Sequence, residues 1–212
     1  MPQTRRFLLA AASLATANLS NLILADAALA AGPQVGQPAP AFSAQDSNGR
    51  TVRLSDYAGK TVVLEWTNHD CPFVMKHYGA HAMQALQAKW TGRGVVWLSV
   101  ISSAPGEQGA VDGPEANRLT QVRGAAPTAV LLDPAGSLGR AYDARTTPHM
   151  FVITPDGTLA YQGGIDDKPS AEPADLKTAK NLVDSALTEL AAGKPVSVRS
   201  AKPYGCSVKY AS

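Results

Sequence analysis

The sequence predicts an α/β fold with a central mixed β-sheet flanked by helices. The order strand, helix, strand over residues 61–101 implies a right-handed parallel crossover. Two apolar runs on either side of Pro155-Asp156-Gly157 add an antiparallel hairpin to the same chain. An N-terminal β-hairpin extension is expected around Asn48-Gly49, a dipeptide typical of tight hairpin turns.

The individual elements follow from hydrophobic periodicity and turn residues. Residues 61–66 and 95–101 are short and apolar on both faces, as buried central strands are. The helix between them is expected to begin at Cys71-Pro72, with Asp70 as its cap, and to continue as one apolar stripe to Trp90. Later elements are expected at these residues: helix 114–122, strand 128–132, helix 138–142, strands 150–154 and 158–162, and a closing helix over about 173–192.

Residues 1–30 have the pattern of a signal peptide. Arg5 and Arg6 precede an almost uncharged Ala/Leu-rich run, and Ala28-Leu29-Ala30 is a typical cleavage pattern. We therefore expect an exported, periplasmic protein that is cleaved near Ala30. The paired arginines also fit the twin-arginine export pattern, and an uncleaved membrane anchor is the alternative interpretation.

Composition excludes several other classes of protein. Residues 31–195 suit a single domain, and residues 196–212 form a tail that carries Cys206. The net charge of +2 includes the two arginines near the N-terminus, and no basic block follows, so nucleic acid is not an expected partner. No later apolar run is long enough to span a bilayer, so no stable membrane association is expected after signal removal.

Several motifs, taken in order, give the chain a family resemblance. They are Val35-Gly36, Leu54-Ser55-Asp56-Tyr57, Gly59-Lys60, Cys71-Pro72, Thr147-Pro148 and Lys202-Pro203-Tyr204-Gly205-Cys206-Ser207. In these motifs the chain resembles the thioredoxin-like superfamily, of redoxin (alkyl hydroperoxide reductase/thiol-specific antioxidant) type, in its peroxiredoxin-like branch. The resemblance implies a thioredoxin fold, a redox-active cysteine at Cys71, and a cis-proline at Pro148 beside it. It also implies a thiol-dependent peroxidase or a thiol-disulfide oxidoreductase with antioxidant activity.

Two departures from the family limit the chemistry. Val74 stands where thioredoxins have the second cysteine of C-x-x-C, which excludes that dithiol cycle. Asn68 stands where peroxiredoxins have a threonine or serine, with Thr67 one position earlier. The substrate is therefore left open between a peroxide and a protein disulfide, and an external thiol reductant is expected.

Cys71 is the candidate nucleophile. A cysteine at a helix N-terminus faces free backbone N–H groups and the positive end of the helix dipole, which favours the thiolate. Asp70 acts in the opposite direction, because a neighbouring carboxylate raises a thiol pKa. The alternative is a buried cysteine without chemistry. Cys206, the only other thiol in the chain, is either a resolving cysteine or half of a permanent clasp.

Three further residues are candidates for catalytic roles. Glu65, in the first buried strand, is either a proton relay with a raised pKa or one half of an ion pair. His149 can hold the thiolate or move a proton, and the alternative is a hydrogen-bonded or solvated histidine without a catalytic role. Arg145 can stabilise a thiolate or a peroxide oxygen, and the alternative is an exposed arginine without a catalytic role. The residues expected to contact substrate are Thr67, Asn68, His69, Pro72, Thr147 and Pro148.

Two other functions remain open. The chain can be a non-catalytic binding module that holds a peptide in the groove near Pro148. His77 and His81, spaced by one helical turn, raise periplasmic copper handling as the other alternative. No cofactor and no bound metal are expected for the leading interpretation.

Overall fold

The computed structural model describes residues 32–211, so the predicted signal peptide at residues 1–30 lies outside the described residues. The strands are β1 (Ser43–Asp46), β2 (Thr51–Arg53), β3 (Val62–Trp66), β4 (Val96–Ile101), β5 (Ala129–Leu132), β6 (Thr146–Thr147), β7 (His149–Ile153), β8 (Leu159–Gly163) and β9 (Cys206–Ser207). The helices are α1 (Pro72–Gly79), α2 (Ala82–Thr91), α3 (Gly113–Val122), α4 (Ser137–Ala141) and α5 (Leu182–Ala191), with 3₁₀ segments η2 (Leu54–Tyr57) and η3 (Pro173–Lys177). Over this range, no helix is long and apolar enough to cross a bilayer.

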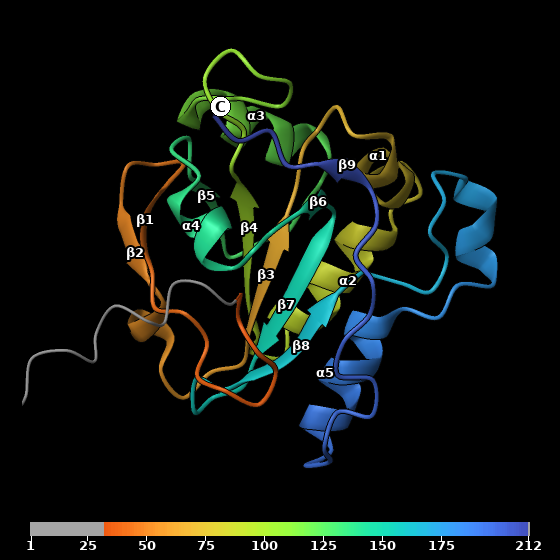
Figure 1. Ribbon diagram of the computed structural model, residues 1–212. Coiled ribbons are helices and arrows are strands. Elements are labelled where there is room, and N and C mark those ends of the chain that lie inside the picture. Colours follow the sequence, from red (N-terminus) through yellow and green to blue (C-terminus); the bar gives the residue numbers. More distant parts are fainter. Residues whose placement is uncertain (1–31, 212) are drawn as a thin grey trace, which may run out of the picture. The chain divides into compact units, whose positions relative to one another are not determined.

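A seven-stranded mixed sheet forms the centre of the domain, as predicted (Figure 1). Its order is β2-β1-β5-β4-β3-β7-β8, and β3, β4 and β5 run parallel to one another. Strand β7 pairs antiparallel with β3, and β8 pairs antiparallel with β7. The predicted hairpin around Asn48-Gly49 is present as β1 and β2, and it joins the sheet through β5.

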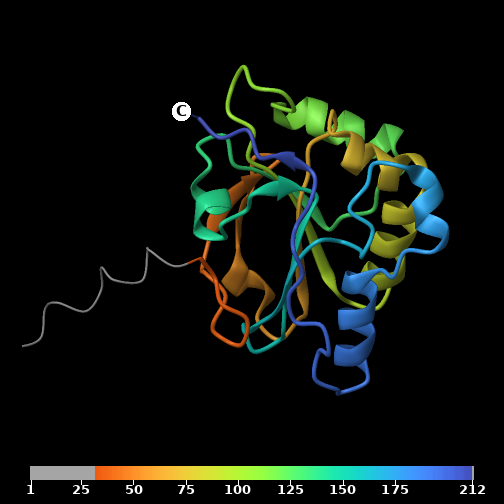
Figure 2. The same ribbon diagram turned by 45° about the vertical axis from the view of Figure 1, so that its right-hand side comes forward.

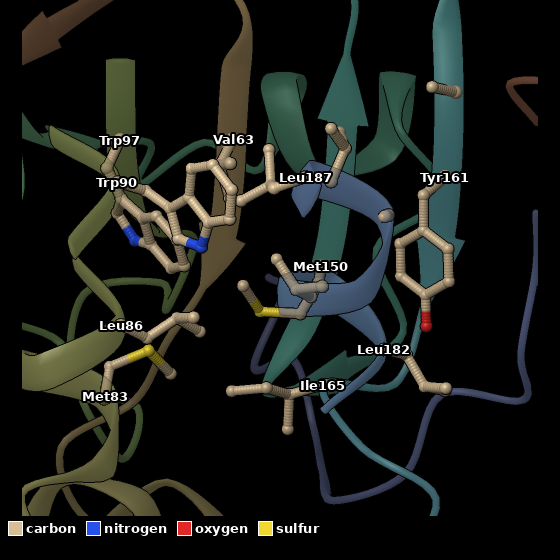
Figure 3. Packing of buried hydrophobic residues seen from close by; sticks show 14 of the residues in the cluster. Val63, Met83, Leu86, Trp90, Trp97, Met150, Tyr161, Ile165, Leu182 and Leu187 are labelled. Carbon is tan, nitrogen blue, oxygen red and sulfur yellow. The ribbon is translucent and has the colours of Figure 1, made fainter. Parts of the chain in front are cut away.

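Each face of the sheet has its own hydrophobic core. Alternate residues of β3 face opposite sides, so Val63 contributes to one core and Leu64 to the other. Figure 3 shows the first core, in which Leu86 of α2 and Leu187 of α5 lie over Val63 and Met150 of the sheet. Cys71 belongs to this same core and is fully buried.

The predicted helix from Cys71 to Trp90 is two helices, so that prediction was wrong in its continuity. The chain leaves α1 at Gly79, and His81 adopts a left-handed φ of 57° before α2 begins. The break is stabilised by the side chain of Gln84, whose Nε2 donates to the carbonyl of Tyr78 at 2.9 Å. Apolar residues on both sides of the break still face the core, which is why the stripe looked continuous in the sequence.

The predicted closing helix also begins later than expected. Residues 173–177 form only the short 3₁₀ segment, and α5 starts at Leu182. Asn181 caps it by accepting a hydrogen bond from the amide of Asp184 at 2.8 Å. This side-chain cap determines where α5 begins.

The C-terminal tail differs most from expectation. Apart from strand β9 and one isolated bridge residue, residues 196–211 have no regular secondary structure, but they pack along the domain rather than extending freely from it. The tail runs beside β8, where the amide of Ala201 donates to the carbonyl of Gln162 at 3.1 Å. Figures 1 and 2 both show it continuing from there to the end of the sheet near α1 and β6. The tail is therefore a docked element of the fold.

Candidate active site

Cys71 lies at the start of α1, just beyond the carboxyl end of β3. It is itself the N-cap residue of the helix, with Pro72 at the first helical position, so the predicted cap at Asp70 is displaced by one residue. The turn before it is closed by a hydrogen bond from the amide of Cys71 to the carbonyl of Asn68 at 3.1 Å. The side chain has no exposed surface. The local sequence thus places a buried thiol at a helix N-terminus.

The pKa of Cys71 is lowered from its ordinary value by a balance of opposed effects. Burial raises the pKa, and the thiol also donates to the carbonyl of Thr147 at 3.1 Å, which favours the protonated form. Hydrogen bonds from the side chains of Cys206 and Thr147 and from the amide of Val74 stabilise the thiolate and outweigh these effects. Cys71 is therefore the more acidic and the more readily ionised of the two thiols.

Cys206 lies beside Cys71, and both thiols are free. Strand β9 pairs antiparallel with β6, so that Cys206 stands opposite Thr147 and Ser207 opposite Thr146. Burial raises the pKa of Cys206 to about 11, and the neighbouring Cys71 adds to this effect. The site therefore contains an acidified thiol and a second, protonated thiol in contact with it.

Asp70 does not oppose ionisation of Cys71 in the way that the sequence suggested. Its carboxylate is half exposed and lies 3.4 Å from Nε2 of His69. The groups that set the pKa of Cys71 are Cys206, Thr147 and the Val74 amide, together with burial. The carboxylate is directed toward solvent and histidine, which explains its small influence on the thiol.

The residues before Cys71 shape the turn that presents it. Asn68 is buried, and its Oδ1 accepts from the amide of Asp70 at 2.9 Å while its Nδ2 donates to the carbonyl of Gln108 at 3.1 Å. Thr67 and the half-buried His69 line a small cavity of about 30 Å³, large enough for water. The hydroxyl of Thr67 has no hydrogen-bond partner within residues 32–211.

Thr147 and Pro148 form the opposite wall of the site. The peptide bond between them is cis, as the resemblance implied. The carbonyl of Thr147 accepts from the Cys71 thiol, and the buried hydroxyl of Thr147 has no hydrogen-bond partner in the described part of the chain. When Cys71 ionises, this hydroxyl can donate to the thiolate, which lowers the pKa of Cys71. Of the predicted substrate contacts, Thr147 is thus the one that touches sulfur directly.

Glu65 is fully buried in a network of neutral donors. Its carboxylate accepts from Trp97 Nε1 at 2.7 Å and from Tyr78 Oη at 2.9 Å. Gln87 Nε2 and Ser99 Oγ complete the set at 3.1 and 3.2 Å. Burial raises the pKa of Glu65, and the four hydrogen bonds partly offset that rise. Across residues 32–211 it forms no ion pair and no hydrogen bond with Cys71.

His149 and Arg145 lie away from the thiol. His149 is on the same face of β7 as Phe151, whose ring centroid is 4.4 Å from its own, whereas Met150 faces the core that contains Cys71. Burial lowers the pKa of His149 to about 4, and its Nδ1 accepts from the amide of Arg145 at 3.3 Å. The guanidinium of Arg145 is largely exposed and pairs with Asp143 at 2.5 Å.

Residues 35–162, more than half of the chain, match the model of the AhpC/TSA family. The chain belongs to this family. Together with the mixed sheet and the cis-proline beside Cys71, the match confirms the predicted thioredoxin-like redoxin fold. No protein among curated sequences matches the chain.

Solved structures extend the likeness over most of this AhpC/TSA chain. An uncharacterised conserved protein from Geobacillus kaustophilus is 25% identical, with a TM-score of 0.67 over 84% of this chain and 93% of its own. A hypothetical protein from Sinorhizobium meliloti 1021 is 22% identical, with a TM-score of 0.67 over 86% and 97%. A protein provisionally described as thiol:disulfide interchange protein DsbE from Chlorobium tepidum is 25% identical, with a TM-score of 0.51 over 62% and 85%.

The two histidines considered for copper are separated in this AhpC/TSA domain. His77 is buried in α1, 3.7 Å from Oδ2 of Asp166, and burial lowers its pKa to about 4. His81 is exposed at the start of α2, beyond the helix break. In the described range, no group of three or more His, Cys, Asp or Glu side chains could hold a metal ion.

Sequence reasoning missed the residues that hold the tail. Tyr204 donates a hydrogen bond to Oδ1 of Asp166, whose Oδ2 lies 3.6 Å from Nζ of Lys76. These residues are far apart in the sequence, and only the motif around Tyr204-Gly205-Cys206 had been singled out. The sequence offered two signals, which were Lys76 within the apolar stripe of a predicted helix and the pair Tyr204-Gly205 directly before Cys206.

Proposed function

We propose that this protein is a thiol-dependent peroxidase of the AhpC/TSA family in which Cys71 is the nucleophile and Cys206 the resolving cysteine. The observation that carries the proposal is the pairing of β9 with β6, which holds the two thiols in contact within one chain. Their opposite pKa shifts support the order of events that we propose. Cys71 ionises first and attacks, while Cys206 stays protonated until it is needed.

The chemistry proceeds in two balanced steps. The Cys71 thiolate attacks one oxygen of a hydroperoxide, the O–O bond breaks, and hydroxide or alkoxide leaves, so that Cys71 becomes a sulfenic acid. The sulfur of Cys206 then attacks the sulfur of Cys71. A disulfide forms, and the hydroxyl of the sulfenic acid leaves as water with the thiol proton. An external thiol reductant restores both cysteines by exchange.

Burial favours a small oxidant as substrate. Cys71 has no exposed surface, and the docked tail covers it, so a hydroperoxide meets less hindrance than a folded protein does. Thr147 contributes a hydroxyl beside the sulfur, where it can bond either the thiolate or a peroxide oxygen. This hydroxyl takes the place of the threonine or serine that peroxiredoxins have at the position of Asn68.

Protein disulfide exchange is a second candidate function. It is favoured by the likeness to the Chlorobium tepidum protein whose description names thiol:disulfide interchange. In that reaction the Cys71 thiolate forms a mixed disulfide with a substrate, and Cys206 then displaces the substrate thiol. The exposed face of α1 carries Met75, a residue that is 55% exposed and offers an apolar contact for a protein.

Rapid mixing of the reduced protein with hydrogen peroxide tests the leading proposal. Quenched samples are analysed by mass spectrometry in the wild type, Cys71→Ser and Cys206→Ser. We expect the wild type to form the intramolecular disulfide, Cys206→Ser to accumulate a sulfenic acid that dimedone traps, and Cys71→Ser to react slowly. Oxidation of Cys71 no faster than that of free cysteine would refute peroxidase function. Turnover of a model protein disulfide in that case would favour the second candidate.

Treatment of the oxidised wild type with dithiothreitol distinguishes a redox-active disulfide from a permanent structural one. A Cys71–Cys206 bond that dithiothreitol reduces in the native state supports a redox cycle. A bond that survives the reductant until the protein is unfolded indicates a structural disulfide instead. A protein that binds peptides but is oxidised by neither hydrogen peroxide nor the model protein disulfide would be a binding module.

We also propose that the protein is exported to the periplasm, on the basis of the signal-peptide pattern in residues 1–30. Fractionation of expressing cells followed by N-terminal sequencing tests this. A periplasmic protein that begins at about Ala31 supports the proposal, and a full-length protein in the membrane fraction contradicts it.

A further inference from the structure

A buried charge cluster links the active-site helix to the tail. Lys76 lies in α1, one and a half turns after Cys71, and its side chain is fully buried. Its Nζ donates to the carbonyls of Lys168 and Ser170 at 3.1 and 3.2 Å and lies 3.6 Å from Oδ2 of Asp166. A buried ammonium group requires such partners because desolvation of an unpaired charge is costly. Lys76 therefore fixes the loop around Asp166 relative to α1.

Asp166 in turn fixes the tail. Its Oδ1 accepts from the amide of Lys168 at 2.9 Å and from the hydroxyl of Tyr204. The Tyr204 ring also packs edge-on against Phe73 of α1, with ring centroids 5.9 Å apart. Its centroid lies 5.8 Å from Nζ of Lys76. Tyr204 is thus held from two sides, by a carboxylate at its hydroxyl and by α1 at its ring.

Only one residue separates Tyr204 from Cys206. Gly205 has a φ of +132°, and an added Cβ would lie 2.1 Å from the carbonyl oxygen of Thr147. The tail backbone therefore lies directly against the carbonyl that accepts from Cys71. This close approach leaves little freedom between the tyrosine that is anchored and the cysteine that follows it.

We propose that Tyr204, held by the Lys76–Asp166 pair, is the positioning residue that sets Cys206 for attack on the oxidised sulfur of Cys71. The inference rests on the proposed function and adds to it a determinant of the second step. Both cysteines are placed by the same helix, Cys71 at its N-cap and Cys206 through Lys76, Asp166 and Tyr204. In the step concerned, the S–S bond forms, the S–O bond of the sulfenic acid breaks, and water leaves.

The inference predicts that the two steps respond differently to loss of the tyrosine hydroxyl. Tyr204→Phe keeps the ring packing against Phe73 and removes only the hydrogen bond to Asp166. We expect the peroxide-dependent oxidation of Cys71 to stay within about twofold of the wild type. We expect the peroxide-independent formation of the disulfide to slow by about tenfold, with dimedone-reactive Cys71 accumulating, since the lost bond is made to a carboxylate.

Tyr210→Phe is the matched control. Tyr210 lies in the same tail beyond Cys206, and its hydroxyl donates to the carbonyl of Ala144 at 2.7 Å. A general loosening of the tail would slow disulfide formation equally in both variants. The inference requires Tyr210→Phe to leave both steps within about twofold, and equal slowing in the two variants overturns it.

A second measurement keeps the inference testable if peroxide proves to be the wrong oxidant. The reduced protein is equilibrated with mixtures of reduced and oxidised glutathione, and the ratio of the Cys71–glutathione mixed disulfide to the Cys71–Cys206 disulfide is measured. We expect the effective concentration of Cys206 toward Cys71 to fall about tenfold in Tyr204→Phe and to be unchanged in Tyr210→Phe. An unchanged value in Tyr204→Phe refutes positioning, whereas slow peroxide oxidation of the wild type refutes only the peroxidase.

Discussion

Cys206 stands directly opposite Thr147 in an antiparallel strand pair, and the carbonyl of that same threonine accepts the hydrogen bond of the Cys71 thiol. Thr147 therefore contacts the Cys71 sulfur through its carbonyl and holds Cys206 through the pairing of the strand backbones. Cys206 need not travel from a remote position to reach Cys71. A chain organised in this way can pass from oxidised Cys71 to the disulfide by a local adjustment of β9.

The first prediction concerns the coupled ionisation of the two thiols. In Cys206→Ala, the pKa of Cys71 should rise, because the thiolate loses the hydrogen bond from the Cys206 side chain. In Cys71→Ala, the pKa of Cys206 should fall below about 11, because burial still raises it but the effect of the neighbouring sulfur is gone. The ultraviolet absorbance of the thiolate, followed against pH in each variant, measures both changes.

If each thiol titrates in its single-cysteine variant at the same pH as in the wild type, this assignment is contradicted. Substitution by alanine rather than serine is essential, because a serine hydroxyl can donate to the Cys71 thiolate in place of the Cys206 thiol. The wild type, reduced beforehand, should show its first thiolate at lower pH than either variant does.

The second prediction concerns Glu65. Glu65→Gln retains an acceptor for the surrounding donors and should reduce the free energy of unfolding only modestly, by about 1 kcal/mol. Glu65→Leu leaves the indole, phenol and serine hydroxyl donors without an acceptor and should cost on the order of 4 kcal/mol. The Gln87 amide keeps only its hydrogen bond to Tyr78 Oη at 3.1 Å. Denaturant unfolding at neutral pH measures both values.

The same variants separate a structural role for Glu65 from a proton relay. Because no hydrogen bond joins Glu65 to Cys71 within the described residues, Glu65→Gln should leave the thiolate titration of Cys71 and its oxidation rate unchanged. A tenfold loss of oxidation rate in this variant, with its stability retained, would instead support the relay.

Much of the fold was predictable because it depends on local patterns. Residues 61–66 and 95–101 were placed correctly as neighbouring parallel strands, since their apolar runs fit only a buried sheet. The break between α1 and α2 was not predictable from hydrophobicity. It depends on a left-handed His81 and on Gln84 bonding back to a carbonyl, neither of which disturbs the apolar stripe.

The candidate site was predictable where the chain itself brings residues together. Cys71 and its neighbours at 67–72 follow one another at the end of a strand, and the family resemblance supplied Thr147-Pro148. His149 was placed by adjacency to Pro148, but alternation along β7 turns its side chain to the other face. The docking of the tail depends on contacts between residues about forty to one hundred and thirty positions apart, such as Tyr204 with Asp166 and with Phe73, and no local pattern encodes them.

The third prediction uses the lowered pKa of His149. Burial lowers this pKa from 6.5 to about 4, so between these values the unfolded chain binds a proton that the folded chain does not. Stability should therefore fall as the pH decreases from about 6.5 to about 4, and His149 should contribute about 3 kcal/mol of that loss. In His149→Asn, whose amide oxygen can accept from the Arg145 amide, the loss should be smaller by this amount.

Unfolding free energies measured at several pH values provide the test. His77, which burial also holds at a pKa of about 4, contributes a similar slope that remains in the variant. If His149→Asn reproduces the wild-type slope, His149 is protonated in the folded state and its described environment is wrong.

The fourth prediction concerns Gly205, where the tail lies closest to the site. Alanine at this position combines an unfavourable φ of +132° with a Cβ that would lie 2.1 Å from the carbonyl oxygen of Thr147. The backbone of the tail must move away, which separates β9 from β6 and uncovers Cys71. We expect Gly205→Ala to react with a bulky aromatic disulfide reagent about tenfold faster at Cys71, because the thiol is buried only while the tail is docked.

Gly193→Ala is the control for backbone strain without a clash. Gly193 precedes the tail with a φ of +68°, and an added Cβ there meets nothing within 4 Å. This variant should react at the wild-type rate, since strain alone does not displace β9. The reaction is followed in a Cys206→Ser background so that only Cys71 is counted. A Gly205→Ala protein in which Cys71 stays as unreactive as in the wild type would show that something other than the tail shields the thiol. The docked tail would then not control access to Cys71.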